Sequence, residues 1–438
     1  MALMETFHIT GGKPLFGEVT LSGTKNAASK MMIASLLTDE PVVLQNVPRQ
    51  HETQITQDII TTIGAQIIWK DEHTLQTTTS TIATSSVQTL SPKNRIGILT
   101  LAPLLHRTGE VFVPFLGGDQ IGPRPVDFHV RALQKMGAQI EESAEGYHAT
   151  TKKRLKGALI ELPYPSVGAT ETAILAGVLA EGRTTIRNAA SEPEILTLIM
   201  MLQDMGAIIQ MNAGRSIEIL GVEKLHGTTV SVLPDRNEAV SYACMALGTH
   251  GEIFVRGAQH EHLMTFLNTV RRIGGEYQVS PDGILFKGGD QYTGVELETD
   301  THPGFMTDWQ QPLVVVLTQA KGISVVHETV YEERFAYTQA LNKMGANITL
   351  FSNCLGEIEC RFKGQNYKHS AVVTGPTPLH AAEVVVPDIR AGLAFVVAAL
   401  VGEGTSLLSG IEHLDRGYER LEEKLLGIGA QIKRVVSN

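Results

Sequence analysis

The sequence predicts a mixed α/β fold with two lobes, each made of three similar units. A short signature, in which an apolar residue precedes Gly and then a small residue, recurs six times along the 438 residues. Counted from their first glycines, successive signatures are 68 to 84 residues apart. A near-constant period over a whole chain indicates internal repetition. The six glycines are Gly64, Gly137, Gly206, Gly274, Gly345 and Gly429.

Each signature marks the end of a predicted helix and the start of a predicted strand. Leu341 and Met344 show the spacing of three that is typical of a helix before the fifth glycine. Glycine suits the left-handed conformation that closes a helix, and an apolar strand follows, as at 430–432. A second helix-and-strand pattern lies midway, as at 179–186 and 400–408. Each unit is therefore predicted to run β-α-β-α-β-β.

Six units predict two lobes of three. The division falls near residues 233–236, where a strand ends and a new unit begins. The first strand, Phe7 to Thr10, is expected to join the last three units. We therefore expect one lobe over 26–233 and a second lobe over 1–25 plus 234–438. Two chain crossings then form a hinge, and the ligand is expected between the lobes.

Composition and charge indicate a soluble, cytoplasmic protein. Hydrophobic residues make up 43% of the chain, and the net charge of -10 argues against nucleic acid or anionic membrane as a partner. The longest apolar run, 391–401, is about half a membrane span, and no signal peptide is recognised. The cysteines, Cys244, Cys354 and Cys360, are few and lack the spacing of a zinc site, which favours a reducing compartment and no metal.

One stretch, 114–127, is too rich in glycine and proline to form a regular helix or strand. It is predicted to be an exposed loop with Asp119 at its tip and Arg124 at its base. An ordinary surface loop remains the alternative for this stretch alone. The loop follows the strand-like residues 111–113 and precedes a helical pattern.

Basic residues recur near predicted helix starts, where free backbone amides favour anions. Lys25 lies at one such start, and Arg334, Arg390 and Arg416 lie near others. Each alone is compatible with an ordinary helix start and a solvated side chain. Their recurrence in an acidic protein predicts a site for anionic ligands.

The chain resembles the UDP-N-acetylglucosamine enolpyruvyl transferase family almost from end to end. The matching stretches occur in the family's order, and they imply a two-lobed inside-out α/β barrel of six repeated units, three per lobe. These stretches are 22–27, 117–127, 166–170, 234–236, 307–308, 333–335, 388–390 and 415–420.

The resemblance implies the reaction and its partners. Phosphoenolpyruvate donates its enolpyruvyl group to the 3-hydroxyl of UDP-N-acetylglucosamine through a tetrahedral intermediate, and phosphate leaves. This is the first committed step of peptidoglycan synthesis. Neither a cofactor nor a metal is implied, and the oligomeric state is left open. Arginine suits such substrates because its planar fork binds oxyanions in pairs.

The resemblance also assigns roles to residues. Asp119 is expected as the acid and Asp308 as the base for the 3-hydroxyl. The donor phosphate is assigned to Lys25, Arg124 and Arg416. The donor carboxylate is assigned to Arg334 and Arg390. Contacts to the nucleotide sugar and neighbouring groups are assigned to Asn26, Arg95, Arg124, Pro125, Val126, Asp127, Phe128, Ser166, Val167, Gly168 and Val330.

The sequence departs from the family pattern at two positions. Asp119 replaces the usual loop cysteine, although the family contains aspartate variants, and Tyr164 replaces a lysine that often lies near the diphosphate. Two other functions stay open. A 3-phosphoshikimate enolpyruvyl transferase would need no uridine pocket, and a non-catalytic paralogue that binds the nucleotide sugar would not need the full set of catalytic residues.

Asp119 generates a prediction about acid chemistry and drug response. An unperturbed Asp is about 99.9% ionised at pH 7, so the role of acid requires a raised pKa. Asp119→Asn is expected to lose nearly all turnover. Fosfomycin alkylates the loop cysteine of the family, and a carboxylate is a weaker nucleophile than a thiolate. The native protein should therefore resist fosfomycin, and Asp119→Cys should be active and sensitive. Full activity of Asp119→Asn, or time-dependent inactivation of the native protein, would contradict the assignment.

Overall fold

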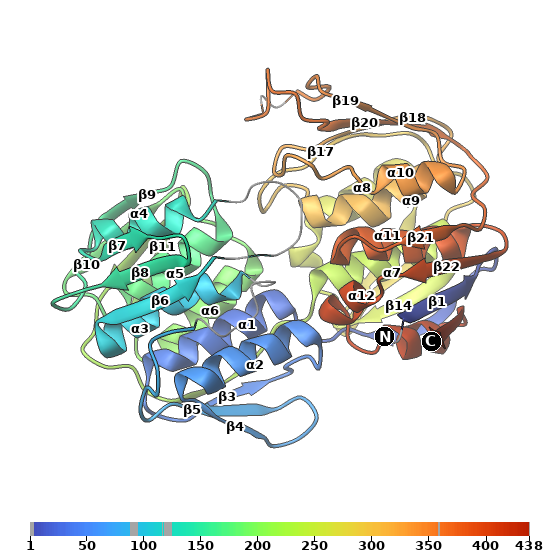
Figure 1. Cartoon of the computed structure of the whole chain (residues 1–438). Helices are drawn as coiled ribbons and strands as arrows, with labels where there is room; N and C mark the ends of the chain where they lie inside the picture. Colours follow the sequence, from blue (N-terminus) through green and yellow to red (C-terminus); the bar gives the residue numbers. More distant parts are fainter. Residues whose placement is uncertain (1–3, 88–94, 116, 118–124, 358–359, 438) are drawn as a thin grey trace. The chain divides into compact units, whose positions relative to one another are not determined.

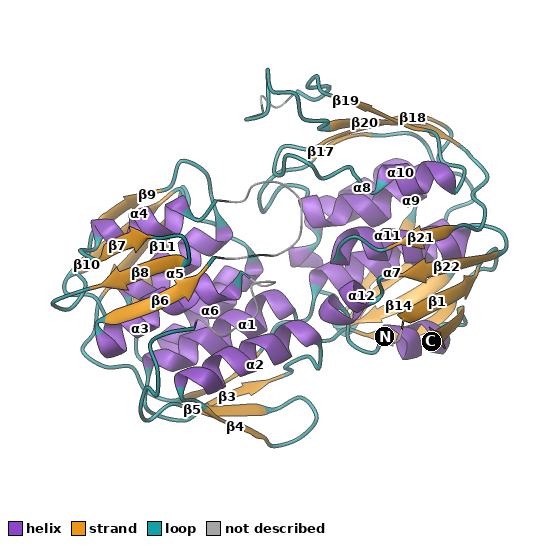
Figure 2. Ribbon diagram, viewed as in Figure 1, coloured by secondary structure: helices purple, strands orange, loops and turns teal. Residues whose placement is uncertain are grey.

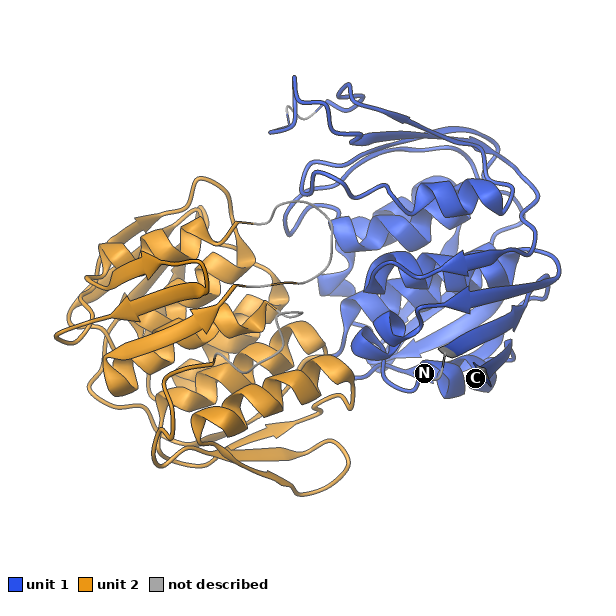
Figure 3. Ribbon diagram, in the orientation of Figure 1, with its two compact units in different colours: residues 1–22, 119–123, 234–438 blue, residues 23–118, 124–233 orange. Residues whose placement is uncertain are grey.

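The computed structural model describes residues 4–87, 95–115, 117, 125–357 and 360–437. Asp119 and Arg124 lie outside these residues. The described chain divides into two compact units (Figure 3). Unit 1 comprises 4–22 and 234–437, and unit 2 comprises the described residues between 23 and 233. Lys25 therefore belongs to unit 2, whereas the sequence placed it in the lobe that contains the termini.

Unit 2 contains three described sheets, with strand orders β13-β3-β5-β4, β6-β8-β7 and β11-β12-β10-β9. Its strands are β3 (Val42–Gln45), β4 (Gln66–Trp69), β5 (Leu75–Thr78), β6 (Glu110–Pro114), β7 (Gln139–Glu142), β8 (Gly146–Thr150), β9 (Leu159–Glu161), β10 (Arg183–Arg187), β11 (Ile208–Asn212), β12 (Ser216–Leu220) and β13 (Thr228–Ser231). Its helices are α1 (Lys25–Ala34), α2 (His51–Ile63), α3 (Leu101–Thr108), α4 (Asp127–Lys135), α5 (Val167–Gly177) and α6 (Pro193–Asp204), with short 3-10 turns η1 (Ser35–Leu37) and η2 (Ile96–Thr100).

Unit 1 contains three further described sheets, with orders β15-β16-β14-β2, β17-β18-β20-β19 and β21-β22-β1-β23. Its strands are β1 (Met4–Thr10), β2 (Phe16–Thr20), β14 (Glu252–Arg256), β15 (Glu276–Ser280), β16 (Gly283–Lys287), β17 (Glu296–Glu298), β18 (Gly322–His327), β19 (Ile348–Phe351), β20 (Ser370–Gly375), β21 (Glu383–Val385), β22 (Thr405–Ser409) and β23 (Gln431–Ser437). Its helices are α7 (Arg236–Gly248), α8 (Met264–Ile273), α9 (Gln310–Leu317), α10 (Thr338–Lys343), α11 (Ile389–Val401), α12 (Glu412–Gly417) and α13 (Leu421–Gly427), with η3 (His260–His262) and η4 (Thr307–Trp309).

Five sheets share one strand arrangement, which confirms the predicted repetition. A strand pairs in parallel with its neighbour, and two antiparallel strands complete the sheet, as in β9, β10, β12 and β11. In the sixth sheet the described part of the chain supplies only an isolated parallel bridge, from Ser86 to Phe112, beside β6. Each sheet is open, so the described strands build a mixed α/β fold without a closed barrel.

Two strands lie next to the passages of the chain between the units, and each pairs within its own unit. β2 precedes the first passage, and it pairs in parallel with β14 of unit 1. β13 precedes the return, and it pairs in parallel with β3 of unit 2. Each strand thus joins a sheet whose other strands lie far away in sequence. The amide of Asp235 donates to Ser22 O within unit 1, and that of Thr24 donates to Leu233 O within unit 2.

The N-terminal strand joins the end of the chain, as the sequence predicts. β1 lies between β22 and β23 and pairs antiparallel with both. Its register with β23 runs from Met4 opposite Ser437 to Thr10 opposite Gln431. The last sheet of unit 1 is therefore completed by the first residues of the chain (Figure 1).

The six repeated glycines adopt the backbone conformation that the signature predicts. Their φ angles lie between 86° and 128°, a region that disfavours residues with a Cβ atom. Each follows a helix and precedes a strand: Gly345, for example, lies between the end of α10 and Ile348, the first residue of β19. The conformation closes the helix and turns the chain into the strand.

Each unit has its own apolar core around central helices, with sheets at the periphery (Figure 2). Every residue of α7 and of α9 is buried, and so is every residue of α11 except Val401. A helix that is buried on all sides belongs to a core, whereas the strands alternate buried and exposed residues. Among the described helices, none combines the length and the apolar composition needed to cross a bilayer.

Two glycines of unit 1 allow a matched test of the helix endings. A Cβ atom at Gly345 would lie 2.6 Å from Pro378 O, whereas one at Gly429 meets no described atom within 4 Å. Gly429→Ala should cost about 1 kcal/mol in unfolding free energy through its backbone conformation. Gly345→Ala should cost about 1–3 kcal/mol more, because the backbone must also move. Urea unfolding measures both variants, and equal losses would contradict the packing argument.

Candidate functional site

The N-terminal ends of the three central helices of unit 1 come together. Asp235 caps α7 by accepting hydrogen bonds from the amides of Asn237 and Glu238. Asp388 caps α11 in the same way, through the amides of Arg390 and Ala391. The 3-10 turn η4 leads into α9, and Trp309 Nε1 donates to Asn237 Oδ1 at 2.9 Å, which joins α9 to α7. Three helix starts thus present partial positive charge at one place.

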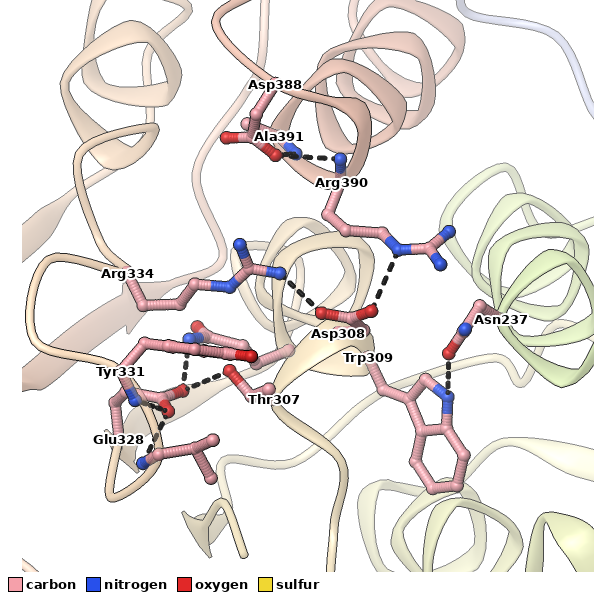
Figure 4. A network of polar contacts seen from close by, with 12 residues as sticks. Asn237, Thr307, Asp308, Trp309, Glu328, Tyr331, Arg334, Asp388, Arg390 and Ala391 are labelled. Carbon is pink, nitrogen blue, oxygen red and sulfur yellow. Dashed lines mark hydrogen bonds and ion pairs between the residues drawn. The ribbon is translucent and has the colours of Figure 1, made fainter. Parts of the chain in front are cut away.

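Asp308 lies at this place and bridges two arginines (Figure 4). Arg334 Nη2 is 2.6 Å from Asp308 Oδ1, and Arg390 Nε is 3.1 Å from Asp308 Oδ2. The arginine side chains are 3% and 7% exposed, whereas Asp308 is 23% exposed. The carboxylate is therefore the part of the cluster that solvent reaches most easily. The structure thus brings together three residues that are distant in sequence, since Arg334 lies 26 positions after Asp308 and 56 positions before Arg390.

Surrounding groups hold both arginines in their charged form. Burial alone would lower the pKa of Arg390, but Tyr418, Asp308 and Asp235 outweigh it and raise that pKa. Burial acts on Arg334 in the same way, and nearby acids, Asp308 first, again raise the pKa. Arg390 Nη1 also donates to Tyr418 Oη at 2.8 Å. The guanidinium groups are thus fixed cations whose direction is set by the fold.

Glu328 is a buried carboxyl group that sequence reasoning did not identify. It accepts hydrogen bonds from Thr307 Oγ1 at 2.9 Å, from Gln310 Nε2 at 2.8 Å and from the amides of Val330 and Tyr331 (Figure 4). Burial raises its pKa, although these hydrogen bonds oppose the shift. Glu328 therefore ties η4, which carries Asp308, to the segment that leads to Arg334.

Val330 has both backbone groups engaged by protein. Its amide donates to Glu328 Oε1 at 2.8 Å, and its carbonyl accepts a hydrogen bond from Arg361 Nη2. One buried donor nearby has no acceptor among the described residues, namely Nε of Arg334. Buried polar groups nearly always have partners, so a ligand or water oxygen fits at this position.

Arg416 lies in α12 and is half-buried. A second polar network in unit 1 consists of Ser22, Glu238, Glu419 and Lys424. Ser22 Oγ donates to Glu419 Oε2 at 2.5 Å, and Lys424 Nζ lies 2.5 Å from Glu238 Oε1. Ser22 is thus committed to this network and does not cap α1, the first helix of unit 2.

The predicted residues of unit 2 also cluster at helix starts. Lys25 and Asn26 are the first two residues of α1 and are half-buried. Arg95 directly precedes η2, which continues into α3. Ser166 caps α5 by accepting a hydrogen bond from the amide of Ala169 at 3.4 Å, and Val167 and Gly168 begin that helix. Thr24 directly precedes α1, but its side chain makes no capping hydrogen bond.

His129 connects the starts of α4 and α5. Its Nδ1 lies 2.8 Å from Thr172 Oγ1, and a Cβ atom at Gly168 would lie 2.9 Å from its Cε1. Burial, with a contribution from the charge of Arg95, lowers the pKa of His129 to about 3. The ring is therefore neutral at physiological pH. Only glycine at position 168 leaves room for it.

Other predicted residues flank this connection. Asp127 begins α4 and lies 3.5 Å from Arg131, while Phe128 packs against the core of unit 2. Val126 is buried, and Pro125 is exposed. Tyr164, at the position where a lysine was expected, is half-buried, and its carbonyl accepts a hydrogen bond from the amide of Ser166.

Sequence reasoning missed Glu328, Tyr418 and His129. Glu328 directly follows the strand-like stretch 323–327, and an acid at the end of such a strand was the available signal. Tyr418 stands within the matched stretch 415–420. His129 carries no distinguishing spacing, so only the structure identifies it.

The fold and these helix starts agree with one class of protein. The family model for EPSP synthase (3-phosphoshikimate 1-carboxyvinyltransferase) matches residues 9–425. The enolpyruvyl transferase NikO from Streptomyces tendae superposes with a TM-score of 0.87 at 23% identity, and each chain is covered completely. EPSP synthase from Acinetobacter baumannii gives a TM-score of 0.73 at 18% identity over 98% of this chain and 100% of the other. The chain thus has the enolpyruvyl transferase fold.

Closer relatives define the family further. UDP-N-acetylglucosamine 1-carboxyvinyltransferase of Protochlamydia amoebophila is 48% identical over 440 residues, which cover 99% of this chain and 95% of the relative. The protein of the same name from Chlamydia trachomatis serovar D is 46% identical over 434 residues, 98% of each chain. This chain belongs to the UDP-N-acetylglucosamine 1-carboxyvinyltransferase family.

The helix α5 that begins with the predicted residues also carries a buried acid, Glu171. Burial raises the pKa of Glu171 to about 7. Lys30 opposes this shift, while Glu194 and Glu192 add to it. Glu171 is only 2% exposed, so its charged form is poorly solvated.

Glu171 should make the stability of unit 2 depend on pH. A carboxyl pKa that is raised from 4.5 to about 7 in the folded state favours folding at low pH. The contribution of Glu171 to the free energy of unfolding is full below pH 4.5, falls as pH rises, and is lost above about pH 7. Glu171→Gln stays neutral at every pH. Its free energy of unfolding should therefore increase relative to that of the native protein between pH 5 and pH 8, by up to about 3 kcal/mol.

Urea unfolding at pH 5 and pH 8 measures this difference. The exposed Glu181, in the turn after α5, provides the control, because Glu181→Gln should differ from the native protein equally at both pH values. A pH-independent difference for Glu171→Gln would show that Glu171 is ionised throughout.

Proposed function

We propose that this chain transfers the enolpyruvyl group of phosphoenolpyruvate to the 3-hydroxyl of UDP-N-acetylglucosamine and releases phosphate. This reaction would be the first committed step of peptidoglycan synthesis, and it would take place in the cytoplasm. The observation that carries the proposal is the carboxylate of Asp308, held between Arg334 and Arg390 at the starts of buried helices. The relatives that share 46–48% of the sequence carry the name of this activity.

The paired arginines suit the carboxylate of the donor. Both guanidinium groups are buried, charged and fixed by neighbours, so they would bind an oxyanion with little reorganisation. The unpaired Nε of Arg334 offers one further donor. Binding of the donor would then replace part of the contact that each arginine makes with Asp308.

Asp308 is suited to accept the proton of the sugar hydroxyl. A carboxylate has about four lone-pair sites, and the two arginines occupy one on each oxygen. The side chain of Asp308 retains 23% of its accessible surface, so a sugar hydroxyl would be able to reach the carboxylate. As the arginines turn to the donor, the negative charge of Asp308 becomes less compensated, which would make it a stronger base.

Residues assigned to the phosphate and the nucleotide sugar complete the proposal. Lys25, Arg124 and Arg416 would hold the phosphate that leaves. The helix starts of unit 2 would bind the nucleotide sugar, and neutral His129 would keep Gly168 and α5 in place without competing for anions. These contacts are proposed for Asn26, Arg95, Pro125, Val126, Asp127, Phe128, Ser166, Val167 and Gly168.

Asp119 is proposed as the acid that protonates the methylene carbon of the donor. A carboxylate at this position would also make the enzyme insensitive to fosfomycin, since that drug requires a thiolate. The proposal needs neither a metal nor an organic cofactor for the transfer, because charge neutralisation by arginine and lysine performs the electrostatic work.

Phosphate release from phosphoenolpyruvate tests the reaction and its acceptor. The purified chain should release phosphate in the presence of UDP-N-acetylglucosamine, and mass spectrometry should find the enolpyruvyl ether of that sugar. No release is expected with 3-phosphoshikimate as the acceptor, because this molecule has no nucleotide to fill the proposed contacts of unit 2. Release with 3-phosphoshikimate alone would assign the other transferase activity, and binding without turnover would assign a regulatory protein.

Two substitutions test the assigned roles. Asp308→Asn should lower kcat by about 10²–10⁴-fold, because the amide cannot accept the proton. Arg416→Ala should cost about 2–4 kcal/mol in transition-state stabilisation. Asp290→Asn, an exposed position in unit 1, provides the control and should match the native rate. Turnover of Asp308→Asn within about threefold of the control would rule out the base.

A further inference from the structure

A second cluster of reactive side chains lies in unit 1, around the sheet formed by β17, β18, β20 and β19. His327 is the last residue of β18, and His369 directly precedes β20. Cys354 and Cys360 lie in the segment between β19 and β20. One ligand atom from each of the four residues lies within 4.8 Å of all the others. The sequence predicted no metal site, because the cysteines lack a familiar spacing and His327 lies 27 positions upstream of the first one.

Two of the separations between these ligand atoms are close to the edges of a small tetrahedron. Cys354 Sγ is 3.3 Å from Cys360 Sγ and 3.4 Å from His369 Nε2. A tetrahedral zinc ion with Zn–S bonds of about 2.3 Å and Zn–N bonds of about 2.0 Å separates its ligand atoms by about 3.3–3.8 Å. The side chains thus already stand close to the spacing of a bound ion.

Hydrogen bonds fix the two histidines with a lone pair toward the cluster. Ser370 Oγ donates to Asn353 O, so it accepts from His327 Nδ1, which lies 2.9 Å away. The nitrogen left without a proton is Nε2, which is buried and has no partner among the described residues. In the same way, His369 Nδ1 donates to Tyr367 O at 2.8 Å, so its Nε2 presents a lone pair to Cys354. Such outer hydrogen bonds are typical of metal-binding histidines.

We propose that His327, Cys354, Cys360 and His369 bind one zinc ion. Two thiolates would balance the charge of Zn²⁺, so that a neutral complex replaces the unpartnered nitrogen in the buried site. All four positions would be filled by protein, which makes the ion structural, with no position left for a substrate. A tetrahedral set of two sulfur and two nitrogen ligands favours zinc over magnesium, calcium or manganese.

The ion would fasten the segment between β19 and β20 to the sheet. Gly356 already approaches the ring of His327 so closely that a Cβ atom would lie 2.7 Å from Cδ2. Phe362 packs edge-on against His369, with ring centroids 5.8 Å apart. His327 is also followed directly by Glu328, whose carboxylate holds the amides of Val330 and Tyr331. Zinc would therefore also stabilise the end of β18 beside the Asp308 cluster.

Metal analysis of the full chain tests the proposal. The protein, purified without chelator, should contain about one zinc per chain. Cys354→Ser combined with Cys360→Ser should reduce zinc at least tenfold. The control is Cys244→Ala, because Cys244 is a third free cysteine, buried in α7 and remote from the cluster in sequence, and this variant should keep its zinc. Zinc in the double variant equal to the control would overturn the proposal.

A measurement on the native protein covers the case in which the double variant fails to fold. Replacement of zinc by Co²⁺ should produce the charge-transfer absorption of thiolate bound to cobalt and the visible bands of a tetrahedral site. Removal of the ion with a chelator should lower the melting temperature and speed amide exchange in residues 353–369. Absence of any stoichiometric metal, or a disulfide between Cys354 and Cys360 in protein kept under reducing conditions, would overturn the proposal.

Discussion

The structure depends on central helices that are buried on every side and can be polar only at their ends. In unit 1 the core surrounds α7, α9 and α11 so fully that side chains along their length cannot reach a ligand. Their N-terminal ends carry partial positive charge, and at α7 and α11 the carboxylates of Asp235 and Asp388 accept hydrogen bonds from the first amides. Asp308 and Arg390 stand at two of these ends, which explains how an acidic protein of net charge -10 can hold a local site for anions.

Charges in this cluster are paired before any substrate arrives. Arg334 and Arg390 would be costly to bury alone, and Asp308 offsets that cost. In the proposed reaction an anionic ligand would therefore replace one partner of each arginine with another, and its binding would not have to bear the full cost of burying two cations. Glu328 keeps the surrounding backbone in place through four hydrogen bonds, so the exchange can occur without a change in the fold.

Much of the fold could be predicted from local sequence, because local chemistry determines it. The repeated glycine marks six helix ends, and at each of them it adopts the positive φ angle that this role requires. The site residues that could be named came from a resemblance to a family, while their contacts needed the structure. The cluster of His327 and Cys354 could not be predicted, since it depends on how β18 and β20 pair. Thr24 directly precedes α1, yet its buried side chain makes no capping hydrogen bond, which only the structure reveals.

The pairing of β1 with β23 has a consequence for synthesis on the ribosome. Met4 lies opposite Ser437, so the first strand made must wait for the last one before its sheet is complete. Unit 2 lies between the two segments of unit 1 and needs no residue beyond 233 for its described sheets. The nascent chain can thus complete unit 2 while unit 1 still exposes the apolar faces of β1 and β2. Unit 1 can complete this sheet only after β23 has been made.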